Sequence, residues 1–158
     1  MEKLTHFNEK GQSRMVDVTQ KDETIRIAVA AGKVLAKLET LQLIADHKFS
    51  KGDVLEVARI AGIMATKRTA DLIPLCHPIP ITGVEVNLSI NQADQSIEIE
   101  AEVQTIGRTG VEMEALTAVS IAALTVYDMC KSVDREMEIS AVYLTKKTGG
   151  KSGVFTRQ

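Results

Sequence analysis

The sequence predicts an α+β sandwich, with an antiparallel sheet and helices packed on one face. Three observations point to this class: a strand-like segment comes first, helix-like segments alternate with strands, and two alternating runs are spaced as a hairpin. The 158 residues are 44% hydrophobic, which suits one domain spanning residues 1–158 with its own core. A ferredoxin-like arrangement is the nearest common template for this order of elements.

The first half of the chain is predicted to supply one strand and two helices. Residues 24–37 alternate and are rich in β-branched side chains, which favours a strand with a break or bulge near Gly32. Residues 39–46 predict a short helix. After the polar residues 50–53, apolar residues recur at helical spacing to about residue 69, which indicates an amphipathic helix.

The second half is predicted to contain the hairpin, the longest helix and a last strand. Residues 81–90 and 96–104 alternate, and residues 107–110 form a turn with Arg108 at its tip. Residues 111–131 contain neither proline nor glycine, and their alanines allow close packing. Residues 137–145 predict a strand, followed by a basic, glycine-rich tail. We expect residues 1–13 and 148–158 to be flexible.

Composition limits the class of partner and the location. Lysine and arginine total 19 against 21 acids, and only 3% of residues are aromatic, so we expect no nucleic-acid partner. Two cysteines are too few for a disulfide framework and indicate a reducing compartment. The N-terminal residues lack the apolar centre of a signal peptide, and no apolar run reaches membrane length. We therefore predict a cytoplasmic protein without a membrane partner.

Residues 72–80 (LIPLCHPIP) predict an ordered loop, because three prolines within seven positions suit neither helix nor central strand. His77 in this loop could transfer protons, although a structural histidine is the more common explanation. A dyad of Cys76 and His77 is disfavoured because adjacent side chains in extended backbone point to opposite faces. Zinc is disfavoured because neither cysteine has a second ligand at suitable spacing.

Several charged residues are candidates for a site. Asp128 and Lys131 lie three apart near a helix end, as a catalytic pair or as the more frequent surface ion pair. Glu112 and Glu114 open the same helix, where acids complement the helix dipole. Cations stand at element ends and loops, where they could converge on a polyanion: Lys51, Lys67, Arg68, Lys131, Lys146, Lys147 and Lys151.

The tail sequence at residues 149–152 (GGKS) is similar to the end of a phosphate-binding loop. The motif fails, because Thr145 stands where its first glycine is required and no helix follows. A basic tail that closes over an anionic ligand and a merely solvated tail are equally compatible with the sequence.

Taken together, eight segments resemble the MoaC family in order and spacing. They are residues 15–18 (MVDV), 51–54 (KGDV), 58–63 (ARIAGI), 67–69 (KRT), 71–78 (DLIPLCHP), 109–117 (TGVEMEALT), 127–131 (YDMCK) and 149–153 (GGKSG). The resemblance implies conversion of 3',8-cyclo-7,8-dihydroguanosine 5'-triphosphate into cyclic pyranopterin monophosphate with release of pyrophosphate, in molybdenum cofactor biosynthesis. It also implies a ferredoxin-like subunit in a homohexamer, a trimer of dimers with the active site at the dimer interface.

The matching positions imply a set of site residues. Asp128 and Lys131 would be the central acid/base groups, assisted by Lys51. The substrate-binding segments would supply Leu75, Cys76, His77, Glu112, Met113 and Glu114, and the phosphates would meet Arg26, Lys67, Lys147 and Lys151. The resemblance implies no metal ligands and no redox cofactor, and leaves open whether magnesium accompanies the triphosphate. Ala70 departs from the family pattern and touches none of these roles.

Two other functions fit the sequence. A binding module could hold a nucleotide or another protein without chemistry. A structural subunit of an oligomer could use Asp128 and Lys131 as an interface ion pair. Substitution of Asp128 distinguishes them: loss of activity with assembly intact indicates an enzyme, whereas loss of assembly indicates a structural role.

Overall fold

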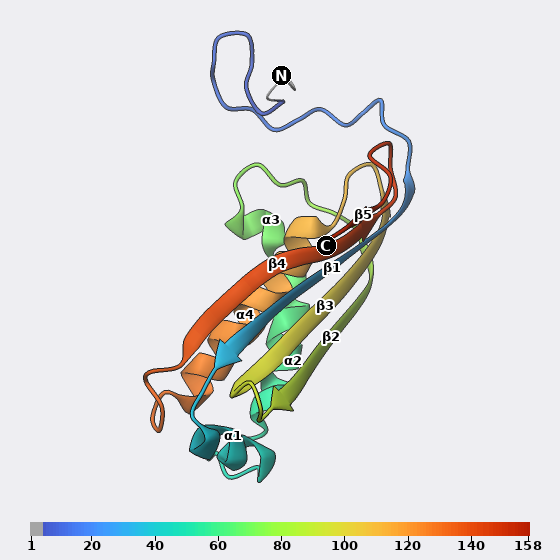
Figure 1. The fold of residues 1–158 in the computed structure, drawn as a ribbon. Coiled ribbons are helices and arrows are strands. Elements are labelled where there is room, and N and C mark those ends of the chain that lie inside the picture. Colours follow the sequence, from blue (N-terminus) through green and yellow to red (C-terminus); the bar gives the residue numbers. More distant parts are fainter. Residues whose placement is uncertain (1–4) are drawn as a thin grey trace.

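The protein is a five-stranded antiparallel sheet with its helices on one face (Figure 1). A computed structural model describes residues 5–158. The elements in chain order are β1 (Thr24–Leu35), α1 (Leu38–Ala45), α2 (Val54–Thr66), α3 (Thr69–Leu72), β2 (Ile81–Asn91), β3 (Ser96–Gly107), α4 (Glu112–Cys130), β4 (Glu138–Thr148) and β5 (Phe155–Thr156).

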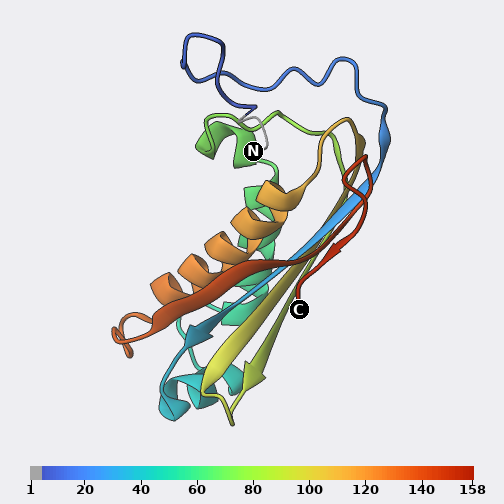
Figure 2. The same ribbon diagram turned by 45° about the horizontal axis from the view of Figure 1, so that its top comes forward.

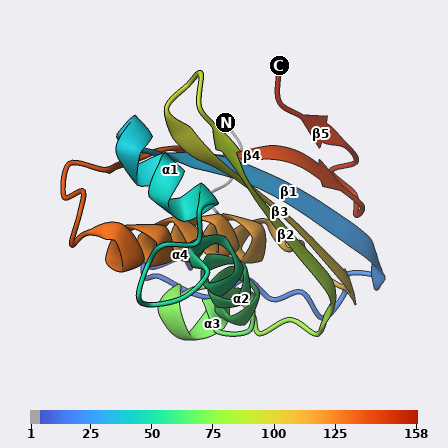
Figure 3. The same ribbon diagram turned by 90° about the horizontal axis from the view of Figure 1, so that it is seen from below.

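The sheet order confirms the predicted fold class. The strands lie in the order β2-β3-β1-β4-β5, and each neighbouring pair is antiparallel. Two halves of the form strand–helix–strand therefore interleave around a central β1 and β3, as in a ferredoxin-like fold. Helices α2 and α4 lie side by side on one face of the sheet, and α1 covers its lower end (Figures 2 and 3).

The central strand β1 shows why α4 packs so close to the sheet. From Ala28 to Val34, every second residue of β1 faces the helices and is buried. One of these is Gly32, where an added Cβ would lie 2.7 Å from Val119 Cγ1 of α4. Only glycine leaves room for the helix at this point. The register of β1 against β4 shifts between Ala31 and Lys33, which confirms the predicted irregularity near Gly32.

Helix α4 forms the centre of the core. Ala115, Ala118, Ala122 and Ala123 are fully buried, and these small side chains admit both the sheet and α2. Gly62 of α2 packs against the Ala118 carbonyl in the same way. By length and composition α4 is the one helix within residues 5–158 that could cross a membrane. In the structure it packs against the sheet on one side and against α2 beside it, as the core helix of a globular domain does.

Buried hydrogen bonds fix the lower end of the molecule. The Asp134 carboxylate, in the connection between α4 and β4, accepts from the Lys37 backbone N–H and the Thr40 hydroxyl, each at 3.0 Å. Both donors belong to the start of α1. Asp53 begins α2 by accepting from the Glu56 backbone N–H at 3.1 Å. These bonds hold the loop between α1 and α2 in place.

The structure moves several of the predicted boundaries. The amphipathic helix ends at Thr66, and a short separate helix, α3, follows. Strand β4 continues to Thr148, so the first residues of the predicted tail belong to the sheet. Phe155 pairs with Lys147 in β5. Residues 5–23 arch over the end of the molecule that carries α3 (Figure 1). The flexibility expected for residues 1–13 and 148–158 stays a prediction, and residues 1–4 lie outside the described part.

Candidate functional site

A cavity of about 310 Å³ gathers six of the predicted substrate-binding residues. The proline-rich loop joins α3 to β2 as predicted and contributes three of them, while the first turn of α4 contributes the others. The loop and the helix start are far apart in sequence, and the fold places them together. Among the residues that line this ring cavity, as we call it, the six predicted ones are Leu75, Cys76, His77, Glu112, Met113 and Glu114.

Glu114 is the buried acid of the ring cavity. It is only 3% exposed, and burial raises its pKa to about 7. The neighbouring Glu112 carboxylate raises the pKa further. Within residues 5–158 Glu114 forms no ion pair. A carboxyl group that is partly protonated at neutral pH can either hold or accept a proton from a ligand in the cavity.

The Cys76 thiol is a poor nucleophile. Burial and the charge of Glu114 raise its pKa, so the thiol stays protonated at neutral pH. The His77 Nε2 donates to the Val16 carbonyl at 2.7 Å. No Cys76–His77 hydrogen bond forms within the described residues. His77 instead anchors the N-terminal segment, which supplies Thr5, His6, Val16 and Val18 to one wall of the ring cavity.

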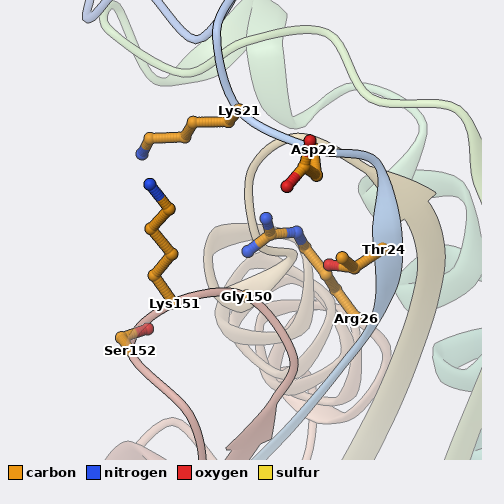
Figure 4. A pocket seen from close by; sticks show the side chains of 7 residues that line it. All are labelled: Lys21, Asp22, Thr24, Arg26, Gly150, Lys151 and Ser152. Atoms are coloured by element: carbon orange, nitrogen blue, oxygen red, sulfur yellow. The ribbon is translucent and has the colours of Figure 1, made fainter.

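A second cavity of about 450 Å³ adjoins the ring cavity, with which it shares Lys21, and most of the residues that line it have charged or polar side chains. Arg26 is fixed at its base, since Nε donates to the Gly107 carbonyl at 2.8 Å and Nη2 to the Arg108 carbonyl at 3.1 Å. The Arg26 side chain also lines the cavity. This anion cavity is lined by Lys21, Asp22, Thr24, Arg26, Gly150, Lys151 and Ser152 (Figure 4).

The glycine pair of the tail allows the anion cavity to form. Gly149 and Gly150 have φ values of 96° and 74°, which L side chains rarely adopt. A side chain at Gly150 would also collide with the Arg26 guanidinium. The turn therefore lets Lys151 and Ser152 close one side of the cavity beside Arg26, although the sequence is not that of a phosphate-binding loop.

Lys147 and Glu112 stand between the two cavities. Lys147 Nζ lies 3.2 Å from Glu112 Oε1 and donates to Ser152 Oγ at 2.7 Å. Both residues, with Arg26, line a narrow gap that shares Arg26 with the anion cavity and Glu112 with the ring cavity. The ion pair is mostly shielded from solvent, because less than a third of either side chain is exposed.

The three predicted catalytic residues form a separate cluster. Lys131 Nζ lies 2.7 Å from Asp128 Oδ1, and Lys51 Nζ lies 3.3 Å from Asp128 Oδ2. Hydrogen bonds from Lys131 and Lys51 hold the pKa of Asp128 below its usual value. About half of each of these side chains is exposed. We call this group the lysine–aspartate cluster.

The cluster and the cavities lie at opposite ends of α4. Fourteen residues separate Glu114 from Asp128 on this helix, or about 21 Å at 1.5 Å per residue. Within one chain, most of the predicted binding residues lie together around the cavities, and the three predicted catalytic residues lie together in the cluster. The cavities and the cluster are not close to each other. Lys67 at the end of α2 lines neither cavity.

Sequence reasoning missed Lys21 and Thr24. Lys21 precedes β1, Thr24 is its first residue, and both line the anion cavity. Lys21 lies in a polar segment that carries no helical or strand pattern, so its sequence gave no reason to place it near the tail. A hydrogen bond from the Lys21 backbone N–H to the Val18 carbonyl, at 3.0 Å, fixes the turn that directs it there.

The fold and these cavities define a ferredoxin-like α+β protein built to hold a small ligand with an anionic end. The chain belongs to the MoaC family, which residues 15–150 match. It is 61% identical over its whole length to a cyclic pyranopterin monophosphate synthase of Thermomicrobium roseum, covering 95% of that protein. It is similarly 57% identical to the Heliobacterium modesticaldum protein of the same name, covering 99% of it.

Proposed function

We propose that this chain is a cyclic pyranopterin monophosphate synthase of molybdenum cofactor biosynthesis. It converts 3',8-cyclo-7,8-dihydroguanosine 5'-triphosphate into cyclic pyranopterin monophosphate and releases pyrophosphate, which makes it a lyase. The observation that carries the proposal is the junction of the ring cavity with the anion cavity. A purine-derived triphosphate has the same two parts, a heterocycle and a polyanion.

Each cavity suits one end of this substrate. In the ring cavity, Glu114 and Glu112 offer carboxyl groups to the N–H donors of a guanine-derived ring, and Leu75 and Met113 supply apolar contacts. In the anion cavity, Arg26 and Lys151 neutralise phosphate charge, with Lys147 at the gap. The same cations stabilise the charge that develops on departing pyrophosphate. Lys67 is assigned to the phosphates by the family resemblance alone.

The lysine–aspartate cluster supplies the proton transfers. Asp128 stays ionised and accepts from both ammonium groups, so it fixes the directions of the Lys51 and Lys131 Nζ atoms. A positioned ammonium group donates a proton as a general acid, and the neutral amine that results accepts one as a base. Ring opening and pterin closure need several such transfers, which two lysines around one carboxylate can share.

The active site requires two chains. A general acid must come within about 3 Å of the atom it protonates, whereas the cluster and the ring cavity of one chain are about 21 Å apart. We propose that the cluster of one chain faces the ring cavity of its partner at a dimer interface, within a trimer of dimers. Exposed apolar side chains on α2 and α4 offer surface for this contact: Val57, Ile60, Met64 and Leu124.

We further propose a cytoplasmic reaction without a redox cofactor, metal ligand, nucleic acid or membrane partner. The rearrangement transfers no net electrons, so the side chains need supply only protons and charge. Cys76 and Cys130 are both free thiols, which suits a reducing compartment. Magnesium may be tested separately, by comparing turnover of the triphosphate with and without a chelator.

The decisive experiment incubates the purified protein with the cyclic dihydroguanosine triphosphate and follows pyrophosphate and pterin together. Asp128→Asn and Lys131→Ala should stay assembled and lose turnover. Asp46→Asn is a matched control, because it breaks a comparable exposed ion pair with Lys48. Binding without turnover by the wild type would favour a binding module, and loss of assembly in Asp128→Asn would favour a structural subunit.

A further inference from the structure

We propose that Lys21 binds the phosphate nearest the ring end of the substrate, at the junction of the two cavities, and that the Thr24 hydroxyl binds the same polyphosphate. This inference deepens the proposed function, on which it rests for the identity of the ligand. Its physical basis is a set of cations and one hydroxyl group around the anion cavity that an anion would pair with.

Lys21 occupies the junction. Among the described residues it is the only one that lines both the ring cavity and the anion cavity. A ligand with its heterocycle in one cavity and its phosphates in the other must pass this side chain. The first phosphate of such a ligand therefore comes within reach of the Lys21 ammonium group.

The charges around the anion cavity are unbalanced. Lys21, Arg26 and Lys151 contribute three cations, against the single carboxylate of Asp22. Figure 4 shows the ammonium groups of Lys21 and Lys151 pointing toward each other, with the Arg26 guanidinium to one side of them. Within residues 5–158, neither lysine forms an ion pair with a carboxylate. Facing cations repel one another, and an anion between them converts this repulsion into attraction.

Thr24 provides an independent observation. Its Oγ1 is buried and, within the described residues, is the one buried side-chain oxygen or nitrogen without a hydrogen-bond partner. The residue lines the anion cavity beside Arg26. Buried hydroxyl groups are normally satisfied, so an unsatisfied one in a residue that lines a cavity points to a ligand. A phosphate oxygen would accept the hydrogen bond that this hydroxyl can donate.

The test measures binding of three probes, which are inorganic tripolyphosphate, GTP and guanosine, by calorimetry on the full chain. Lys21→Met should weaken tripolyphosphate and GTP binding roughly tenfold, the loss expected for one charge-assisted contact, and leave guanosine unchanged. Lys21→Arg should retain most of the affinity. Lys10→Met is the matched control, an exposed lysine of the N-terminal segment that lines neither cavity.

Thr24→Val tests the hydroxyl separately, because valine keeps the shape and removes the unsatisfied group. It should weaken tripolyphosphate binding while leaving the free protein equally or more stable. In the synthase assay, Lys21→Met should raise KM far more than it lowers kcat, since Lys21 binds the phosphate in substrate and transition state alike.

The outcomes separate this inference from the proposed function. If the wild type lacks synthase activity but Lys21→Met still loses tripolyphosphate binding, the anion subsite stands and the synthase proposal fails. If the wild type turns over and Lys21→Met binds tripolyphosphate as tightly as Lys10→Met, the assignment of Lys21 is overturned. Wild-type protein that binds no tripolyphosphate would overturn it as well.

Discussion

Glu114 shows how a single residue of the site opposes folding. Its carboxyl group is buried at the start of α4, and burial moves its pKa to about 7. In the unfolded chain the pKa is near its ordinary value, so between the two values the folded state binds the extra proton. Stability therefore falls as pH rises through this window. A ligand that donates hydrogen bonds to the carboxylate would relieve the cost.

We predict that Glu114→Gln stabilises the protein at pH 8 and much less at pH 5. The gain between these pH values should be about 2 kcal/mol, after allowance for solvent screening, because glutamine carries no charge to bury. Urea denaturation at fixed protein concentration measures it. Glu85→Gln, on the exposed face of β2, is the control and should show no such pH dependence. An equal gain at both pH values would exclude charge burial as the cause.

Asp128 presents the opposite case, a residue with little role in folding. Its partners are exposed lysines, and exposed ion pairs add little to stability. We predict that Asp128→Asn melts close to the wild-type temperature and loses roughly 100-fold or more in kcat, the usual effect of removing an acid/base group. Scanning calorimetry and the coupled pyrophosphate assay measure the two effects. A large fall in melting temperature would instead indicate a structural residue.

For single residues, the sequence predicted which residues belong to the candidate site better than it predicted which residues they contact. The spacing of Asp128 and Lys131 predicted their ion pair, because helix geometry alone brings residues three apart together. The third member, Lys51, required the tertiary packing of α2 against α4. The place of Lys21 and Thr24 in the site could not be predicted, because it depends on the turn at Gly149 and Gly150 packing beside β1, and this turn is distant in sequence.

At the scale of elements, the connection between α4 and β4 holds α1 in place through one buried acid. Asp134 is 2% exposed and accepts from three donors, the Lys37 N–H, the Thr40 hydroxyl and the Glu136 N–H. The bonds from Lys37 and Thr40 fix the start of α1 against the connection between α4 and β4.

We predict that Asp134→Ala costs about 2 to 4 kcal/mol of unfolding free energy, because it leaves buried donors without an acceptor. Urea denaturation at one protein concentration measures the loss. Asp46→Ala, which removes an exposed carboxylate at the end of α1, is the control and should change little. If both variants lose the same amount, the buried hydrogen bonds of Asp134 do not stabilise α1.

Element boundaries were harder to predict than element types. The predicted helix ran to about residue 69, yet the chain turns at Lys67 and Arg68 and starts α3. The basic residues Lys146 and Lys147 suggested a tail. In the structure they extend β4, since pairing with β1 satisfies their backbone whatever their side chains.

At the scale of the whole molecule, the separation of the two site groups was already present in the sequence. The predicted helix contained both Glu114 and Asp128, and its rise fixes their distance at about 21 Å. What the sequence could not supply was the direction in which each group faces. The structure adds that the cavities and the cluster lie at opposite ends of one chain, which makes assembly a requirement of the proposed chemistry.

This requirement predicts complementation between two inactive variants. Asp128→Asn damages the cluster and Arg26→Ala the anion cavity, so each homomeric protein should be inactive. In a mixed dimer, one of the two sites combines an intact cluster with an intact cavity. After dissociation and reassembly of equal amounts, random pairing should restore about a quarter of wild-type activity. Simple mixing without dissociation is the control. A reassembled mixture that stays inactive would contradict a site shared between chains.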